Sequence, residues 1–202
     1  MLNFLKGRSA KLADAIDRGA LDKLGPLLNR FDADQLNGPL LEGQSATERA
    51  IRANQAGALR LILDKGGTAD TLASDGQPLS PLALQQPDSL ALLSALLQAG
   101  ANANGCDQAG RSLLQLCLIH CPPARRMLHL NRLIQHGADL QSQPQLLLNA
   151  LQQQDRELVQ FLVNSGLDLP DTLPDAEYDA ELLNYARRLQ QDRQIRQAFF
   201  NR

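Results

Sequence analysis

Aliphatic side chains recur along the chain in one fixed arrangement. Five segments place an aliphatic residue three positions before a pair of adjacent aliphatic residues, and a turn follows each pair. The segments are Leu24 with Leu27-Leu28, Leu59 with Ile62-Leu63, Leu93 with Leu96-Leu97, Leu130 with Leu133-Ile134, and Val159 with Leu162-Val163. Spacing of i, i+3 and i+4 places three side chains on one face of an α-helix. The pattern therefore predicts five amphipathic helices.

These helices recur at nearly constant intervals. The steps end at residues 31, 66, 100, 137 and 166, so successive spacings are 35, 34, 37 and 29 residues. Glycine stands at four of these ends: Gly66, Gly100, Gly137 and Gly166. Glycine has no Cβ, so it accepts the left-handed backbone conformation in which many helices end. A period near 34 indicates a repeat protein, whose units bury one another's apolar faces.

A second, shorter helical stretch precedes each of these helices. Ser45 with Glu48 three residues later is a capping-box pattern, and Ser80-Pro81 predicts a hydroxyl N-cap followed by proline at the first helical position. Ser112 opens another such helix. Small residues recur in the middle of these stretches, where a neighbouring helix approaches closely: Ala15, Ala50, Cys117 and Ala150. The predicted unit is helix–turn–helix–loop.

The loops and helix ends of these units resemble the ankyrin repeat. Residues 107–115 (D-Q-A-G-R-S-L-L-Q) resemble its opening D-x-x-G-x-T-P-L-H, and residues 96–104 and 137–140 resemble its ending L-L-x-x-G-A-D-V-N. The resemblance covers roughly residues 10–170, and it is preferred over the alternative of a tetratricopeptide or HEAT-like array. It implies an all-α ankyrin-repeat solenoid. Residues 1–38 would form an N-terminal capping repeat, 39–172 four repeats, and 173–202 a C-terminal capping helix.

The chain departs from the family pattern in two places. The histidine that follows T-P-L in the motif is replaced by Glu48, Ala83, Gln115 and Leu148 in the successive units, so its hydrogen bonds must be absent or replaced. The fourth unit carries an insertion at residues 120–126, whose two prolines stop the first helix and open the turn between the helices.

The last segment, residues 173–202, has a helical stripe of its own. The stripe consists of Tyr178, Leu182, Tyr185, Ala186 and Leu189, continued by Ile195 and Phe199. Solenoid ends need a helix with a polar outer face to cover their exposed core, so we interpret this segment as a cap. The alternative is a docking helix for a partner or a second copy, suggested by the pair Phe199-Phe200.

Composition narrows the classes of partner and compartment. The formal net charge is −2, which argues against nucleic acid as the main partner, because phosphate binding needs an excess of clustered Lys and Arg. No run of 18 apolar residues occurs, so we expect no membrane partner. The first seven residues lack the order of a secretory signal, and three cysteines do not form a disulfide framework. We expect a cytoplasmic protein.

Candidate chemistry is sparse. No phosphate-binding, dinucleotide-binding, serine-hydrolase or H-E-x-x-H motif occurs, so we expect no cofactor and no catalytic residues. Cys117, His120 and Cys121 share a helical face, with Cys106 upstream, and three cysteines with one histidine are a valid zinc set. We interpret these thiols as packing residues because no C-x-x-C occurs, and we expect no metal. His129 is expected on the solvent side of its helix.

The resemblance also implies where partners bind: at loop tips and the exposed ends of the first helices. The corresponding positions are Glu42, Gln44, Arg52, Gln77, Leu79, Asp88, Gln108, Arg111, His120, Gln141, Ser142 and Gln152. Leu79 is expected to be an exposed apolar contact. The leading hypothesis is a non-enzymatic module that binds another protein in the concave groove, with a homo-oligomer also open. The alternatives are an inhibitor or antidote that occludes a toxin or enzyme, and a metal- or thiol-dependent enzyme using Cys117, His120 and Cys121.

Overall fold

The computed structural model describes residues 2–173 and 178–200, with the backbone alone at residues 2–6 and at Phe200. The remaining parts of the predicted capping segments, residues 1, 174–177 and 201–202, lie outside the described residues. The chain divides into two compact units at residues 138 and 139, here called unit 1 and unit 2. Unit 1 holds α1 to α9 and unit 2 holds α10 to α12.

The described residues form helices joined by loops. In unit 1 they are α1 (Leu2–Asp17), α2 (Leu21–Leu28), α3 (Ala33–Asn37), α4 (Ala46–Arg52), α5 (Ala56–Asp64), α6 (Leu79–Leu84), α7 (Ser89–Gln98), α8 (Leu113–His120) and α9 (Pro123–Gln135). In unit 2 they are α10 (Pro144–Gln152), α11 (Arg156–Asn164) and α12 (Ala180–Phe200). β-structure among the described residues is limited to isolated bridges in loops. The all-α fold predicted from the sequence is confirmed.

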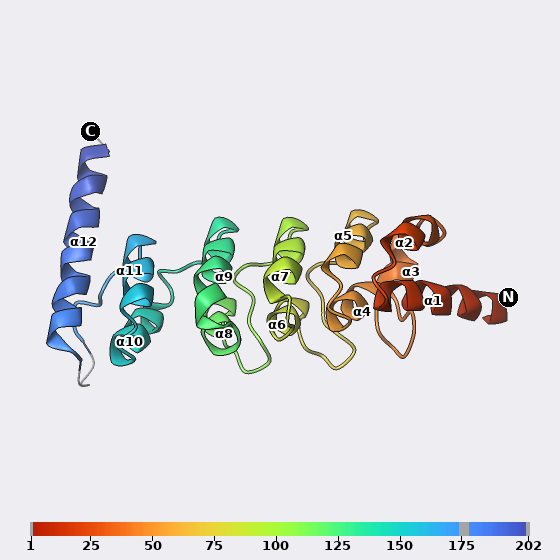
Figure 1. Ribbon diagram of the computed structural model, residues 1–202, viewed down its shortest axis with the longest axis horizontal. Coiled ribbons are helices and arrows are strands. Elements are labelled where there is room, and N and C mark those ends of the chain that lie inside the picture. The colour runs from red at the N-terminus through yellow and green to blue at the C-terminus, as the bar shows by residue number, and fades with distance from the viewer. Residues whose placement is uncertain (1, 174–177, 201–202) are drawn as a thin grey trace. The chain divides into compact units, whose positions relative to one another are not determined.

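The helices of unit 1 form pairs that lie side by side (Figure 1). The pairs are α1 with α2, α4 with α5, α6 with α7, and α8 with α9. First helices contact the next first helix, from α1 through α4 and α6 to α8, and second helices do the same from α2 to α9. Each helix therefore buries one face against its pair mate and another against the neighbouring repeat. This is the helix–turn–helix–loop architecture expected of ankyrin-like repeats.

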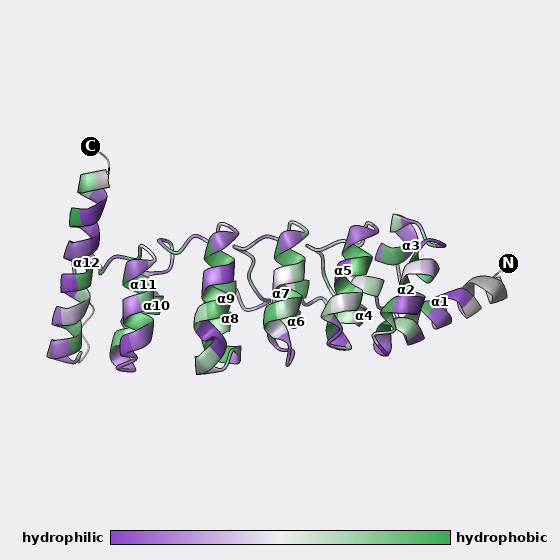
Figure 2. Ribbon diagram, turned by 45° about the horizontal axis from the view of Figure 1, so that its top comes forward, coloured by the Kyte–Doolittle hydropathy of each residue, from purple (hydrophilic) through white to green (hydrophobic). Residues whose placement is uncertain are grey.

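Aliphatic and small side chains fill the space between the pairs. Helix α7 is coloured largely as hydrophobic in Figure 2, and most of its residues are buried. The small residues predicted at close helix approaches are all buried: Ala15, Ala50 and Cys117 in unit 1, and Ala150 in unit 2. A small side chain lets two helix backbones come close without loss of packing density.

The predicted glycine helix ends are confirmed. Gly66, Gly100 and Gly137 have φ angles of 96°, 93° and 86°, and Gly166 of unit 2 has 115°. Two non-glycine residues, Asn54 and Gln154, have φ angles of 55° in the turns between α4 and α5 and between α10 and α11. Residues other than glycine are uncommon in this region, and asparagine is among those found there most often. The Asn54 Oδ1 accepts the Asp88 backbone N–H at 2.9 Å.

Amide side chains tie the beginning of a repeat to its end. The Asn37 side chain, at the end of α3, donates to the Gly66 carbonyl at 3.0 Å, just after α5. The Asn104 side chain, before α8, donates to the Gly137 carbonyl after α9, also at 3.0 Å. In unit 2 the Gln141 side chain makes the corresponding bond to the carbonyl of Gly166. These bonds satisfy carbonyls that the helix ends leave without an intrahelical partner.

One predicted helix start was wrong, and one short helix was missed. Helix α6 begins at Leu79 after the N-cap Pro78, so Ser80 and Pro81 lie inside the first turn and do not start it. The finger turn at Gly76 (φ 82°) sets this register, because its backbone pairing brings Pro78 to the helix start. The short helix α3 was not predicted; its capping box, in which Asp32 and Gln35 bond each other's backbone N–H groups, is a signal the sequence offered.

In unit 2, helix α12 packs against α11 of the pair α10/α11. Leu182 and Ala186 of its predicted stripe are buried, whereas Ile195 and Phe199 are 55% and 73% exposed, so the stripe is not covered along its whole length. The side chain of Phe200 is outside the described residues. The sequence did not reveal Arg193, which is buried, pairs with Asp168 and donates to the Val163 carbonyl at 2.8 Å.

Candidate functional site

The candidate site of unit 1 is built on the loops that precede α4, α6 and α8. We call these loops fingers 2, 3 and 4 (residues 40–45, 72–78 and 106–112). Antiparallel bridges close them: Leu41 with Gln44, Leu72 with Pro78, and Cys106 with Ser112. Gln44, Gln77 and Arg111 each follow the turn glycine, and their carbonyls accept the backbone N–H four residues earlier at 2.8, 2.8 and 3.0 Å. Three residues predicted from separate repeats thus occupy one equivalent position.

A buried carboxylate joins α4 to finger 3. Glu48 is 1% exposed, and its carboxylate accepts the Ser74 N–H at 2.8 Å and the Ser74 Oγ–H at 2.7 Å. It also accepts the Arg52 Nε–H at 2.8 Å. Half of the predicted capping box is present, because Ser45 Oγ accepts the Glu48 N–H at 3.1 Å. The other half is missing, because the Glu48 carboxylate bonds finger 3 and not the Ser45 backbone N–H. Glu48 therefore supplies hydrogen bonds at the position where the family motif has histidine.

Arg52 continues this link to the tip of finger 3. Its Nη2 lies 2.6 Å from the Asp75 carboxylate, and the Gln108 side chain of finger 4 donates to the Asp75 carbonyl at 3.5 Å. The Arg52 hydrogen bond lowers the pKa of the Asp75 carboxyl below its ordinary value, and the Gln77 N–H adds to this. Two predicted contact residues thus hold the tip of finger 3: Arg52 from α4 and Gln108 from finger 4.

Finger 2 is held by an arginine that the sequence analysis did not select. Arg49 makes a bidentate pair with Asp17 at 2.8 and 2.7 Å, and donates to Gln44 at 3.4 Å. Its Nη1 lies 3.5 Å from the Glu42 carboxylate. Bidentate arginine–carboxylate geometry is the strongest form of ion pair. Glu42 and Gln44 therefore have a fixed support on α4.

Finger 4 carries an ion pair of its own. The Arg111 guanidinium lies 2.6 Å from the Asp107 carboxylate, which also accepts the Arg111 backbone N–H at 2.9 Å. The hydrogen bond from the Arg111 side chain is the main reason that the pKa of Asp107 is lowered. Half of the Arg111 side chain stays exposed, so it can reach a partner.

The remaining predicted residues of unit 1 are exposed or half-buried. The side chains of Gln77, Asp88 and His120 make no hydrogen bond or ion pair within residues 2–173 and 178–200. Side chains without an internal partner are available to an external one.

The prediction that Leu79 is exposed is wrong. Leu79 is 1% exposed because it occupies the first position of α6, equivalent to the buried Ala46 and Leu113 of the neighbouring repeats. The exposed apolar residue of finger 3 is Leu72, at 62%. Leu72 stands at the start of the finger bridge, where its side chain faces solvent.

The predicted residues of unit 2 lie around the pair α10/α11. Gln141 and Ser142 are exposed in the loop before α10, where the Asp139 side chain accepts both of their N–H groups, at 3.0 and 3.3 Å. Gln152 is exposed at the end of α10. The Gln141 amide is already engaged by the Gly166 carbonyl.

The thiol cluster differs from the one the sequence suggested. Cys106 and His120 are exposed, whereas Cys117 and Cys121 are buried, and the Cys121 backbone N–H donates to the Cys117 carbonyl at 3.1 Å. His129, expected at the surface, is 1% exposed. Its position one residue before the buried Leu130 and four before Leu133 was a signal that it lies on the apolar face.

The buried His129 of α9 lies within hydrogen-bond distance of a carbonyl of its own helix and of a hydroxyl of α7. Its Nδ1 lies 2.9 Å from the Arg125 carbonyl and its Nε2 lies 3.0 Å from the Ser89 Oγ. The hydrogen bond from Cys117, together with His129, lowers the pKa of the Cys121 thiol below its ordinary value. Conversely, the hydrogen bond to Cys121 and burial raise the pKa of Cys117. Within the described ranges, no three His, Cys, Asp or Glu side chains are arranged to hold a metal ion.

A helix that spans a membrane must be long and predominantly apolar. In the portion of the chain that the structure describes, every helix is too short or too polar to cross a bilayer.

Comparisons with known proteins found a likeness in fold. No protein-family model matches the chain. No curated protein matches it. Among solved structures, the chain is similar to the ankyrin repeat domain of Bcl-3, described as a unique member of the IkappaB protein family. The two share 22% sequence identity with a TM-score of 0.48, over 88% of this chain and 97% of that chain. A likeness at this identity and TM-score says nothing of what the chain binds.

Proposed function

We propose that this chain is a non-enzymatic module that binds a protein partner through the finger surface of unit 1. The finger surface comprises fingers 2 to 4 with Arg52 at the end of α4. The observation that carries this proposal is the equivalent placement of Gln44, Gln77 and Arg111 after the turn glycine in three successive fingers. A row of like-placed side chains on a rigid scaffold matches the extended surfaces that repeat proteins use for binding.

Pre-organisation supports the proposal. Glu48 and Arg52 hold finger 3 from the preceding repeat, and Gln108 connects finger 4 to finger 3. Because the loops are ordered by these bonds before any partner arrives, binding costs less conformational entropy. Loops on a rigid scaffold are also where binding residues concentrate.

The exposed chemistry of the surface fits a protein partner. It combines the apolar Leu72 with the amides Gln77 and Gln108 and the half-exposed guanidinium of Arg111. An apolar anchor among polar groups is the usual composition of a protein interface. Leu72 takes the role that the sequence analysis gave to Leu79. Glu42, Asp88 and His120 extend the proposed surface, while Gln141, Ser142 and Gln152 remain separate predictions for unit 2.

The test is a surface variant with Leu72→Ser, Gln77→Ala, Gln108→Ala and Arg111→Ala. A matched control carries Arg60→Ala, Asp64→Ala and Gln98→Ala, which are exposed residues of α5 and α7 away from the fingers. Both proteins and the wild type are immobilised and exposed to host extract, and retained proteins are identified by mass spectrometry. We expect a protein that the wild type and the control retain and the finger variant loses, with unchanged far-UV circular dichroism melts. Equal retention by all three would contradict the proposal.

A further inference from the structure

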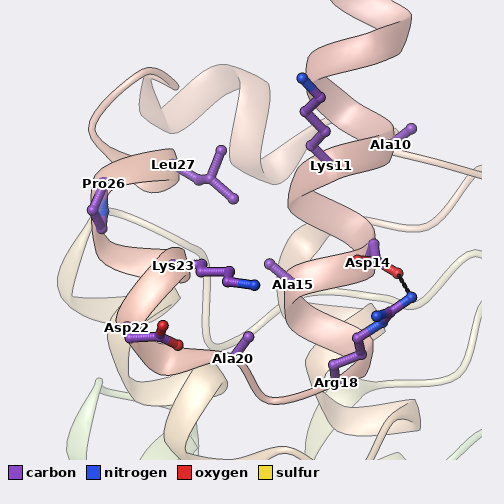
Figure 3. A pocket seen from close by; sticks show the side chains of 10 residues that line it. All are labelled: Ala10, Lys11, Asp14, Ala15, Arg18, Ala20, Asp22, Lys23, Pro26 and Leu27. Carbon is purple, nitrogen blue, oxygen red and sulfur yellow. Dashed lines mark ion pairs between the residues drawn. The ribbon is translucent and has the colours of Figure 1, made fainter.

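The outer side of α1 and α2 encloses a hollow of about 700 Å³. Figure 3 shows the Leu27 side chain pointing from α2 into the space between the helices, with Ala15 of α1 and Ala20 of the connecting turn beside it. Lys23 extends from α2 across this space toward α1. The hollow thus has an apolar floor and charged edges.

No third helix of the described chain covers this hollow. All of its lining residues belong to α1, to α2 or to the turn that joins them. On their other faces the same two helices pack against α4 and α5. The outer side of α1 and α2 therefore lacks the helical cover that the pairs α4/α5 and α6/α7 have on both sides within unit 1.

Unit 2 shows how the same chain covers the side of a pair. There α12 packs against α11, burying Leu182 and Ala186 and placing the Arg193 guanidinium beside Asp168. The cover is a helix with an apolar stripe and a charged side chain that pairs at the edge. An apolar helix surface in a solenoid is stabilised by a cover of this kind.

The charges around the hollow define the chemistry of the missing cover. Arg18 and Asp14 pair with each other at 2.8 Å. Lys11 and Lys23 are exposed and form no ion pair with any described residue, and Asp22 is likewise unpaired. The lining carries one net positive charge. Two unpaired ammonium groups beside an apolar floor are complementary to carboxylates that flank an apolar stripe.

We infer that the hollow between α1 and α2 binds an amphipathic helix of another protein, whose apolar stripe packs on Ala20 and Leu27 above the buried Ala15. Acidic side chains beside the stripe pair with Lys11 and Lys23. This surface is separate from the fingers, so the chain has two docking surfaces with different chemistry.

The experiment uses two labelled synthetic peptides and fluorescence anisotropy. Both peptides are amphipathic helices with leucines at i, i+3, i+4 and i+7; one carries glutamates beside the stripe and the other lysines. The variant is Lys11→Glu with Lys23→Glu, and the matched control is Arg60→Glu with Lys65→Glu, which are exposed residues of α5 and its C-cap. We expect the wild type and the control to bind the glutamate peptide at least about tenfold more tightly than the lysine peptide.

Charge reversal at Lys11 and Lys23 should invert this preference, which a merely unfolded variant cannot do. The finger variant of the preceding section should bind the glutamate peptide as the wild type does, so the two proposals fail separately. Equal binding of both peptides, or no binding, overturns the inference. Self-association that the reversed variant loses would assign the hollow to a second copy, and binding of decanoate without the peptide would assign it to a small amphiphile; either result also overturns it.

Discussion

Replacing Glu48 by alanine should destabilise the chain, because the change removes a buried link between α4 and finger 3. Its carboxylate is 1% exposed and accepts three hydrogen bonds, two from Ser74 and one from Arg52. Hydrogen bonds to a charged group contribute about 1.5–3 kcal/mol each when a partner is deleted. The total loss of stability is smaller than the sum of these contributions, because the exposed Ser74 can bond to water and Arg52 retains its ion pair with Asp75.

We therefore expect Glu48→Ala to lower the free energy of unfolding by about 3 kcal/mol, at the lower end of the range for breaking a buried pair. Ser74→Ala removes only the hydroxyl donor and should cost about 1 kcal/mol. The control is Glu42→Ala, which removes a 72% exposed carboxylate whose nearest arginine nitrogen is 3.5 Å away. A surface pair of this kind contributes less than about 0.5 kcal/mol. Alanine favours helix more than glutamate does, so propensity cannot explain a loss at position 48.

Urea unfolding followed by far-UV circular dichroism measures these differences. With a slope of about 2 kcal/mol/M, a loss of 3 kcal/mol moves the midpoint down by about 1.5 M. Repeat arrays can unfold in stages, so the comparison requires the same slope in each variant. A midpoint for Glu48→Ala within the range of the Glu42→Ala control would refute the reasoning that Glu48 anchors finger 3.

Three further changes test local geometry. A Cβ at Gly67 would lie 2.7 Å from an isoleucine methyl of α5, so Gly67→Ala should cost about 1–3 kcal/mol in urea unfolding. Gly7→Ala, with open space around its Cβ inside α1, should gain about 0.5–1 kcal/mol. Gln154→Gly should relieve the backbone strain at φ 55° and raise the urea midpoint of unfolding. Asn54→Gly relieves the same strain but also removes the hydrogen bond from the Asp88 N–H, so it should not raise the midpoint. Equal gains in the two variants would contradict this expectation. Because the pKa of the Cys121 thiol is lowered in the folded protein, its contribution to the free energy of unfolding is largest above the pKa of an unfolded thiol and decreases as pH falls. The difference in stability between wild type and Cys121→Ser should therefore grow from about pH 6 to about pH 8. A constant difference would show that Cys121 is not ionised in the folded protein over that range.

The sequence predicted the repeated elements because local rules determine them. The i, i+3, i+4 pattern located the second helices, and glycine at the helix ends located their termini, since both depend on residues within one or two turns. Leu79 shows where local rules fail. Pro78 and Pro81 are both compatible with a helix start, and the choice between them depends on how finger 3 folds back on itself.

The candidate site was less predictable than the fold. The finger positions Gln44, Gln77 and Arg111 followed from the repeat alignment, but the bonds that hold them connect residues far apart in sequence, such as Glu48 with Ser74 and Asp17 with Arg49. Charge alone does not say which of many partners a carboxylate takes. Burial of polar side chains posed the same difficulty at His129 and Arg193, whose partners lie on other elements.

The amide bonds that join the two ends of a repeat have a chemical vulnerability. Asn37 and Asn104 are each followed by glycine, the neighbour that least hinders attack of the backbone nitrogen on the side-chain amide. Loss of ammonia would turn each donor into a carboxylate, which cannot donate and would face the carbonyl oxygen of Gly66 or Gly137. Ageing of the protein would therefore loosen the second and fourth repeats first, and the third, which has Asp70 in the corresponding loop and no such bond to lose, would be spared.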